Sequence, residues 1–238
     1  MSRAPRAHGV PSWRRGSSAH PDASGTSGDD GFSLVELMIA LVVLAILLAI
    51  AVPTFLGTTA VANNRSAQAN LNTALTDAKA QYQSAGQTFY VNSVQDAAGF
   101  ASLLTAAQLS MAFKAGSDGA TVATGSSGSA SSVSVSVSAD GSGLVLAAYS
   151  LPGNCYYLID NTGGLTAASK AVAPYTGATA VTTSPVAAAA GTIGLPTVIG
   201  ESFVTVRGDA TAADCNAYSP KTSGSPATVQ YLTSGFPL

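Results

Sequence analysis

The chain has 238 residues and a formal net charge of −2, and only 9% of its residues are charged. This length allows one medium-sized domain and a membrane segment. Six basic and nine acidic residues follow Gly31, and their formal charge of −3 argues against nucleic-acid binding through a basic surface. Both histidines precede Gly31, which excludes histidine-based catalysis and histidine-ligated metals beyond it. We therefore expect no catalytic residue, no metal, no cofactor and no enzymatic activity.

Residues 1–31 contain four arginines among serine, glycine and proline, without a hydrophobic period. We expect an unstructured cytoplasmic leader there. Basic residues that precede an apolar segment favour the cytoplasmic side of a membrane, which leaves everything after Leu56 outside.

Residues 32–56 form the apolar segment, with sixteen uncharged residues in a row from 37 to 52. As a helix it measures about 37 Å, enough to cross a hydrocarbon core of about 30 Å. Glu36 costs about 2.5–3.5 kcal/mol in lipid and is therefore a candidate functional residue. Pro53 lacks an N–H group and predicts a kink. The alternative is a secretory signal cut after Ala51, but Glu36 at its start and Pro53 just past the cut argue against it.

Residues 57–86 predict an amphipathic continuation of the same helix. Gly86 is a natural C′ residue, so the helix should end near Ala85. The whole helix would have about 54 residues and measure roughly 80 Å. Its apolar residues recur with helical spacing on one face: Leu71, Leu75, Ala78 and Tyr82.

Residues 87–238 predict a β-rich extracellular head and, with the long helix, an α+β fold with a four- to five-stranded antiparallel sheet. A short helix is predicted over 96–104, and Thr105-Ala106-Ala107-Gln108 has the form of a capping box. Residues 165–196 lack a period and are expected to be a long loop. Strands are predicted at 133–137 (half-buried) and 144–151, as a hairpin, and at 154–160, 202–207 and 228–232.

Several side chains of the head have two interpretations. Tyr156 and Tyr157 are expected to place one ring in the core and one on the surface of a strand, in preference to forming a stacking platform. Three aspartates precede glycines within a few residues, and for them turn chemistry is favoured over calcium ligation: Asp118, Asp140 and Asp160. For Asp209 and Asp214, a solvated loop is favoured over a carboxylate pair.

Cys155 and Cys215 are the only cysteines of the chain. An even pair in an exported domain favours one disulfide. Two buried free thiols are the alternative.

The apolar segment begins with Gly31-Phe32-Ser33-Leu34-Val35-Glu36-Leu37. This stretch, with the helix that follows and Pro53 in its usual place, resembles the processing site of type IV pilins, most of all those of Gram-positive bacteria. The resemblance covers residues 31–86. The chain departs from the family at Asp29-Asp30, where many members carry a basic residue.

The resemblance implies cleavage after Gly31 by prepilin peptidase, a membrane aspartyl protease, and N-methylation of the new terminus at Phe32. Glu36 would pair with the Phe32 amine of a neighbouring subunit. The two residues are four apart, so they would share a helical face, and a pair within one subunit is equally open.

The chain is thus expected to be a structural subunit of a type IV pilus. Its expected partners are other pilin subunits, prepilin peptidase, the assembly platform protein with its ATPase, and the lipid bilayer before assembly. It would be a single-pass membrane protein first and part of an extracellular pilus afterwards. The alternatives are a minor pilin or pseudopilin, a membrane-anchored adhesion module that does not polymerise and, more distantly, a secreted enzyme.

Overall fold

The computed structural model describes residues 31–116, 132–151, 153–175, 184–187, 191–208, 211–222 and 227–236. The chain divides into two units, residues 1–48 and 49–238. The long helix α1 (Leu34–Ser84) has 51 residues and contains Pro53, so the predicted continuous helix is confirmed to within two residues at each end. The predicted boundaries at 56/57 and 86/87 stay predictions.

The end of α1 follows from a glycine. Gly86 adopts a φ of 77°, in the left-handed region where a side chain is disfavoured. The N–H of Gln87 then donates to the carbonyl oxygen of Tyr82 at 2.9 Å, the six-to-one bond of a Schellman motif. The predicted role of Gly86 as a helix terminator is confirmed.

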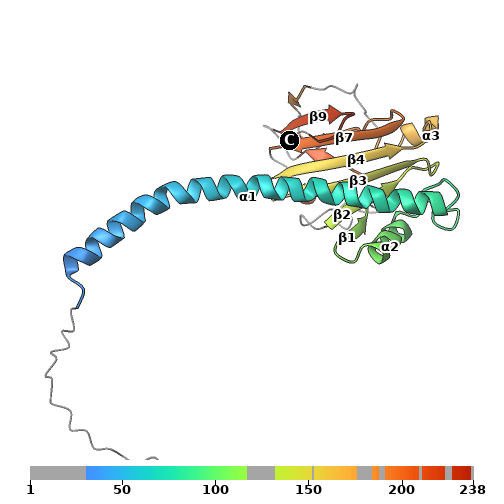
Figure 1. The fold of residues 1–238 in the computed structure, drawn as a ribbon. Helices are drawn as coiled ribbons and strands as arrows, with labels where there is room; N and C mark the ends of the chain where they lie inside the picture. Colours follow the sequence, from blue (N-terminus) through green and yellow to red (C-terminus); the bar gives the residue numbers. More distant parts are fainter. Residues whose placement is uncertain are drawn as a thin grey trace, which may run out of the picture. The chain divides into compact units, whose positions relative to one another are not determined.

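The second half of α1 packs on the sheet through one face, as predicted (Figure 1). Alanine takes three of the five buried positions. Tyr82 is partly buried against the same cluster. The buried residues are Ala67, Leu71, Ala74, Leu75 and Ala78.

The main sheet has seven strands in the order β1-β2-β3-β4-β7-β9-β5, and β6 and β8 form a separate pair. The predicted hairpin (β2–β3) and the strands β4, β7 and β9 are confirmed, but the predicted count of four to five strands is too low. The sheet is also not purely antiparallel, because β1 and β2 run parallel. The strands are β1 (Ala112–Ala115), β2 (Ser132–Val137), β3 (Gly143–Ser150), β4 (Asn154–Asn161), β5 (Val186–Ala187), β6 (Gly191–Thr192), β7 (Gly200–Arg207), β8 (Lys221–Thr222) and β9 (Thr228–Leu232).

Both faces of the sheet are covered, and this corrects two predictions. Tyr156 and Tyr157 are both buried, one in the cluster under α1 and the other in the cluster on the opposite face. The alternating serines of β2 are buried as well, so β2 is not half-buried. Ser134 accepts a hydrogen bond from the N–H of Ala217 at 3.0 Å, which satisfies its hydroxyl inside the second layer.

Helix α2 (Ala97–Ala107) begins where predicted and continues three residues further. Asp96 caps it by accepting a hydrogen bond from the N–H of Gly99 at 2.8 Å. Thr105 does not start another helix. It lies inside α2, and its hydroxyl donates to the carbonyl oxygen of Ala101 at 2.8 Å, so the predicted capping box at Thr105 is wrong.

The segment predicted as one long loop, 165–196, contains short elements where it is described. They are α3 (Ala167–Lys170), β5 and β6. Two-residue strands and a four-residue helix are too short to show a period in sequence, which explains the miss.

Turn chemistry explains Asp140, as predicted, but not Asp160, which lies buried in β4 and forms an ion pair with Lys79. The Asp140 carboxylate accepts hydrogen bonds from the hydroxyls of Ser138 and Ser142, at 2.6 and 2.8 Å, and from the N–H of Thr166 at 2.7 Å. Burial favours a raised pKa for Asp140, but these donors hold it well below its usual range. Asp118 and Asp209 lie outside the described residues.

Candidate processing and assembly segment

The Gly31–Phe32 bond lies just before α1 and is accessible. Residues 31–33 are not helical, and the Phe32 side chain is 84% exposed. A Cβ atom added to Gly31 would meet nothing within 4 Å. A protease therefore finds an open, irregular chain at this bond.

Ser33 and Glu36 form the start of α1. The carbonyl oxygen of Ser33 accepts the first helical bond, from the N–H of Leu37 at 3.1 Å, which makes Ser33 the N-cap and Glu36 the N3 residue. Ser-x-x-Glu is a capping-box sequence, and a carboxylate in the first turn also interacts favourably with the helix dipole. The sequence interpretation missed Ser33, although this spacing was available to find it. As the acidic residue of the first turn, Glu36 complements the helix dipole, in addition to the role that the resemblance implies.

Phe32 lies outside α1 in the uncut chain, since the helix begins at Leu34. The expected same-face relation between Phe32 and Glu36 requires two further residues in helical conformation. Loss of the preceding chain at Gly31 would leave Phe32 free to adopt it. The structure thus leaves the pairing a prediction, and it adds a conformational step to it.

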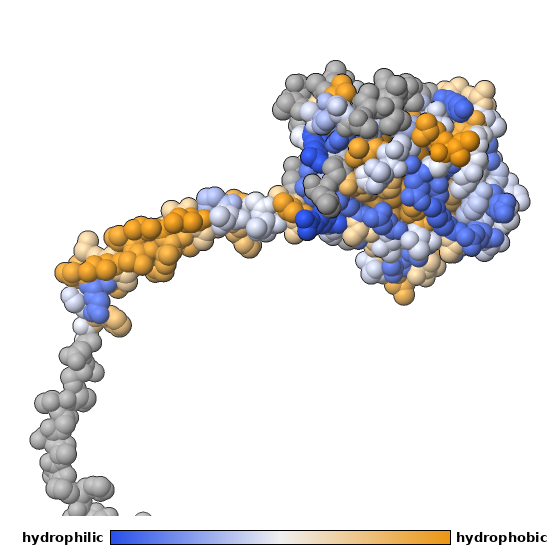
Figure 2. Space-filling view, turned by 45° about the horizontal axis from the view of Figure 1, so that its top comes forward, coloured by the Kyte–Doolittle hydropathy of each residue, from blue (hydrophilic) through white to orange (hydrophobic). Residues whose placement is uncertain are grey.

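The side chains of the apolar segment point into open space. The large apolar residues from Leu34 to Leu56 are each 50–74% exposed. On the face drawn in Figure 2 they form a continuous hydrophobic surface. Among the described residues, α1 is the one helix long and apolar enough to cross a membrane. A surface of this kind requires lipid or other helices around it.

The threonine hydroxyls near the end of this surface form hydrogen bonds with the backbone of α1 itself. Pro53 removes the N–H that would bond to the carbonyl of Ala49. The hydroxyl of Thr54 donates to the carbonyl oxygen of Ala51 at 2.9 Å, and Thr58 bonds Phe55 in the same way at 2.9 Å. Hydroxyls bonded within the helix tolerate an apolar environment, so α1 can continue through Pro53 in lipid. The predicted kink at Pro53 stays a prediction.

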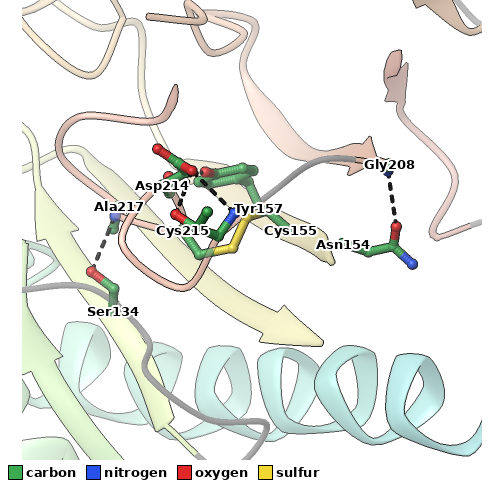
Figure 3. The surroundings of a disulfide bond; sticks show 9 residues. Ser134, Asn154, Cys155, Tyr157, Gly208, Asp214, Cys215 and Ala217 are labelled. Carbon is green, nitrogen blue, oxygen red and sulfur yellow. Dashed lines mark hydrogen bonds between the residues drawn. A yellow bond between two sulfur atoms is a disulfide. The ribbon is translucent and has the colours of Figure 1, made fainter. Parts of the chain in front are cut away.

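The two cysteines form the predicted disulfide on the sheet face opposite α1 (Figure 3). The Cα atoms of Cys155 and Cys215 are 5.5 Å apart, and both residues are fully buried. Beside the bond, the hydroxyl of Tyr157 donates to the carbonyl oxygen of Asp214 at 2.9 Å. Burial, reinforced by the charge of Asp214, raises the pKa of Tyr157 and keeps it a donor. The disulfide therefore fixes the segment before β8 on the second layer.

The described residues bring no three histidine, cysteine, aspartate or glutamate side chains together as metal ligands. Asp214 lies in a loop and accepts from the N–H of Thr211 at 3.0 Å, in agreement with the solvated-loop interpretation.

Comparison with protein families identifies one segment of the chain. Residues 27–52 match the prokaryotic N-terminal methylation motif, the class III signal peptide of type IV pilins. No curated protein and no solved structure matches the chain. The motif is of a structural, pilin type, and it indicates the precursor of a type IV pilin-like protein or a pseudopilin. It implies processing by prepilin peptidase, anchoring in a membrane and assembly into pilus-like filaments.

Proposed function

We propose that the chain is a structural subunit of a type IV pilus and not an enzyme. The observation that carries the proposal is the methylation motif at the start of a helix whose large apolar side chains are exposed from Leu34 to Leu56. In this proposal residues 1–31 are the leader, 32–56 the membrane and assembly helix, 57–86 its amphipathic half and 87–238 the extracellular head.

The proposed cycle has two stages. Before assembly the apolar segment lies in the bilayer, with the head outside, and prepilin peptidase removes the leader. The platform protein and its ATPase then transfer the helix from lipid to a bundle of identical helices. Lipid and helices are equally apolar, so packing and polar contacts between helices must favour the bundle.

Glu36 supplies such a polar contact. A charge in an apolar environment requires a partner, and the amine at Phe32 of a neighbouring subunit is the proposed one. Pairing across subunits would fix the axial register of the helices, the use for which buried ion pairs are best attested.

Processing is tested by mass and fluorescence. Trp13 is the only tryptophan and precedes Gly31, so the mature protein should lack indole fluorescence and begin at Phe32. Gly31→Leu is the matched variant, since a side chain there meets no neighbouring atom and leaves the fold unaffected. It should retain Trp13. A wild-type protein isolated from cells with its indole signal intact would contradict the proposal.

Assembly is tested by replacing Glu36 with glutamine. Glutamine can still close a capping box, so Glu36→Gln removes the charge and keeps the helix start. We expect normal membrane insertion and no filaments in electron micrographs of sheared surface material, whereas Glu36→Asp should retain some assembly. Wild-type filaments from Glu36→Gln would refute the register role. Mass spectrometry of wild-type filaments distinguishes a major subunit from a minor one.

A further inference from the structure

A hollow of about 200 Å³ lies between α1 and the sheet, and two arginines line it. Arg65 projects from α1, and Arg207 is the last residue of β7. Within the described parts of the chain, both ion pairs involve Lys79, and neither arginine takes part in one. The chain after Gly31 has six cationic residues and a net charge of −3, and two of these six cations line the same hollow. Two nearby cations attract an anion.

The walls of the hollow are preformed. The amide oxygen of Asn64 accepts hydrogen bonds from the Ser150 hydroxyl at 2.7 Å and from the Asn154 amide at 3.0 Å. The oxygen of Asn154 accepts from the N–H of Gly208 at 3.3 Å. These bonds tie α1 to the ends of β3, β4 and β7, so the hollow requires no rearrangement to receive a ligand.

The remaining polar lining also suits an anion. Gln68 is on α1, and the buried Tyr156 lies in the floor. Burial raises the pKa of Tyr156, while hydrogen bonds with Gln68 and Asn154 and the charge of Arg207 partly oppose this. The phenol therefore stays neutral beside Arg207 and leaves the arginine charge uncompensated.

The hollow lies at the end of the sheet from which the apolar segment continues. Lys79 of α1 contacts Glu201 near the start of β7, whereas Arg65 and Arg207 line the hollow at the other end, so α1 and β7 run antiparallel. Arg65 is nine residues beyond Leu56, about 13 Å along the helix. Helical side chains tilt toward the N-terminus, and a long arginine reaches back further. Its guanidinium thus approaches the headgroup layer, which is about 5–8 Å thick on each side of the hydrocarbon core.

An apolar surface adjoins the basic hollow on the membrane side. Thr54, Gly57 and Thr58 line a shallow hollow along α1, and Val61 belongs to both hollows. The two hydroxyls there bond to the helix backbone, so this surface is apolar in character. A charged site that continues into an apolar strip matches an amphipathic anion.

We propose that Arg65 and Arg207 bind the phosphate of an anionic phospholipid, with an acyl chain along Thr54–Val61. The inference rests on the membrane-anchored stage of the proposed function. Guanidinium groups bind phosphate through paired hydrogen bonds, whereas a zwitterionic lipid would bring its ammonium group next to two arginines. The lipid holds the head at the membrane surface before assembly.

The test uses the full chain reconstituted in nanodiscs of equimolar phosphatidylglycerol and phosphatidylcholine. Native mass spectrometry measures the ratio of the two lipids that stay bound. We expect the wild type to retain more phosphatidylglycerol than phosphatidylcholine. In Arg65→Gln/Arg207→Gln this ratio should fall roughly tenfold or more, because each arginine at an anionic surface contributes about a factor of five. Lys114→Gln/Lys170→Gln carries the same charge change at exposed positions elsewhere and should keep the enrichment.

Each other outcome overturns the inference. Equal retention of both lipids by an inserted wild-type chain would do so and leave the pilin function intact. An equal loss in both double variants would show a non-specific charge effect. Displacement of the lipid by inorganic phosphate would show a site for the free ion. Carbodiimide cross-links in Arg65→Lys from the new amine to a carboxylate of a second copy, without bound lipid, would show a subunit contact. A chain that does not float with vesicles would contradict membrane anchoring itself.

Discussion

Lys79 lies between two carboxylates that face each other on neighbouring strands. Asp160 of β4 and Glu201 of β7 are register partners. The Lys79 ammonium is 3.7 Å from Oδ2 of Asp160 and hydrogen-bonds to Oε1 of Glu201. The Asp160 side chain is only 5% exposed, whereas those of Lys79 and Glu201 are 41% and 40% exposed. Lys79→Met keeps the aliphatic stem and leaves two carboxylates without their cation.

The expected cost lies between two limits. Removing one partner of a fully buried pair costs about 3–5 kcal/mol, and an exposed pair contributes about 0.2–1 kcal/mol. One of the three groups here is buried and the other two are screened by water, so we expect a loss of about 2 kcal/mol. For a unit of this size the unfolding midpoint should fall by roughly 4–8 °C.

The sign of the pH dependence follows from Asp160. Burial raises the pKa of Asp160, Lys79 lowers it and Glu201 raises it further. A carboxyl group with a raised folded-state pKa binds its proton more tightly when folded, so its ionisation destabilises the fold as pH rises from the unfolded value of about 3.9. Without Lys79 this pKa rises more. The cost of Lys79→Met should therefore be largest at neutral pH and shrink as pH falls towards about 4.

Circular dichroism melts of the full chain in detergent, at neutral pH and at about pH 4, measure both effects. Lys114→Met, on the exposed side of β1, is the control and should change stability by less than about 0.5 kcal/mol. Adding Asp160→Asn to Lys79→Met should recover part of the loss. Equal losses in the two methionine variants, or a loss at acid pH as large as at neutral pH, would refute the reasoning.

Three further predictions concern the unit formed by residues 49–238. Leu71→Ala leaves a cavity in the buried interface between α1 and the sheet and should lower the free energy of unfolding, measured with denaturant, by about 2–5 kcal/mol. An unchanged denaturation curve would contradict this prediction. Cys155→Ser/Cys215→Ser removes a cross-link over 60 residues and should lower the free energy of unfolding by up to about 4 kcal/mol in the chain-entropy model. Reductant should cause the same loss in the wild type and should not change the stability of the variant. Asp140→Asn should weaken the turn before β3. Because folding lowers the pKa of Asp140, its ionised carboxylate stabilises the fold above the unfolded-state pKa of about 3.9, and this stabilisation is lost as pH falls through the folded-state pKa. The difference between Asp140→Asn and wild type should therefore narrow in acid, and a constant difference would contradict it.

The long helix and its end could be predicted because their causes are local. Hydrophobic content, the 3.6-residue period and the left-handed Gly86 act within a few residues, and the sequence displays them directly. The same holds for the start of the helix at Asp96 and for the turn around Asp140. The capping-box spacing of Ser33 and Glu36 is equally local and equally visible in the sequence.

The burial of β2 and of Tyr157 could not be predicted, because a second layer of the fold covers the sheet face on which these side chains lie. An alternating Val-Ser strand predicts one wet face, but the segments around Leu165, Leu195 and Cys215 cover that face and bury the serines and Tyr157. The strands β1, β5 and β6 gain their partners from distant parts of the chain, which a local period cannot reveal. Long-range pairing depends on the shape of the whole sheet.

The sequence by itself thus determined the methylation motif, the apolar helix, the α+β class and the single pair of cysteines, because each depends on neighbours in the chain or on composition. Only the tertiary structure decided that Arg65 and Arg207, 142 positions apart, face one hollow and that Lys79 meets Asp160 and Glu201. Both groupings exist because α1 runs along β4 and β7, and packing between elements, not sequence spacing, sets which charges meet.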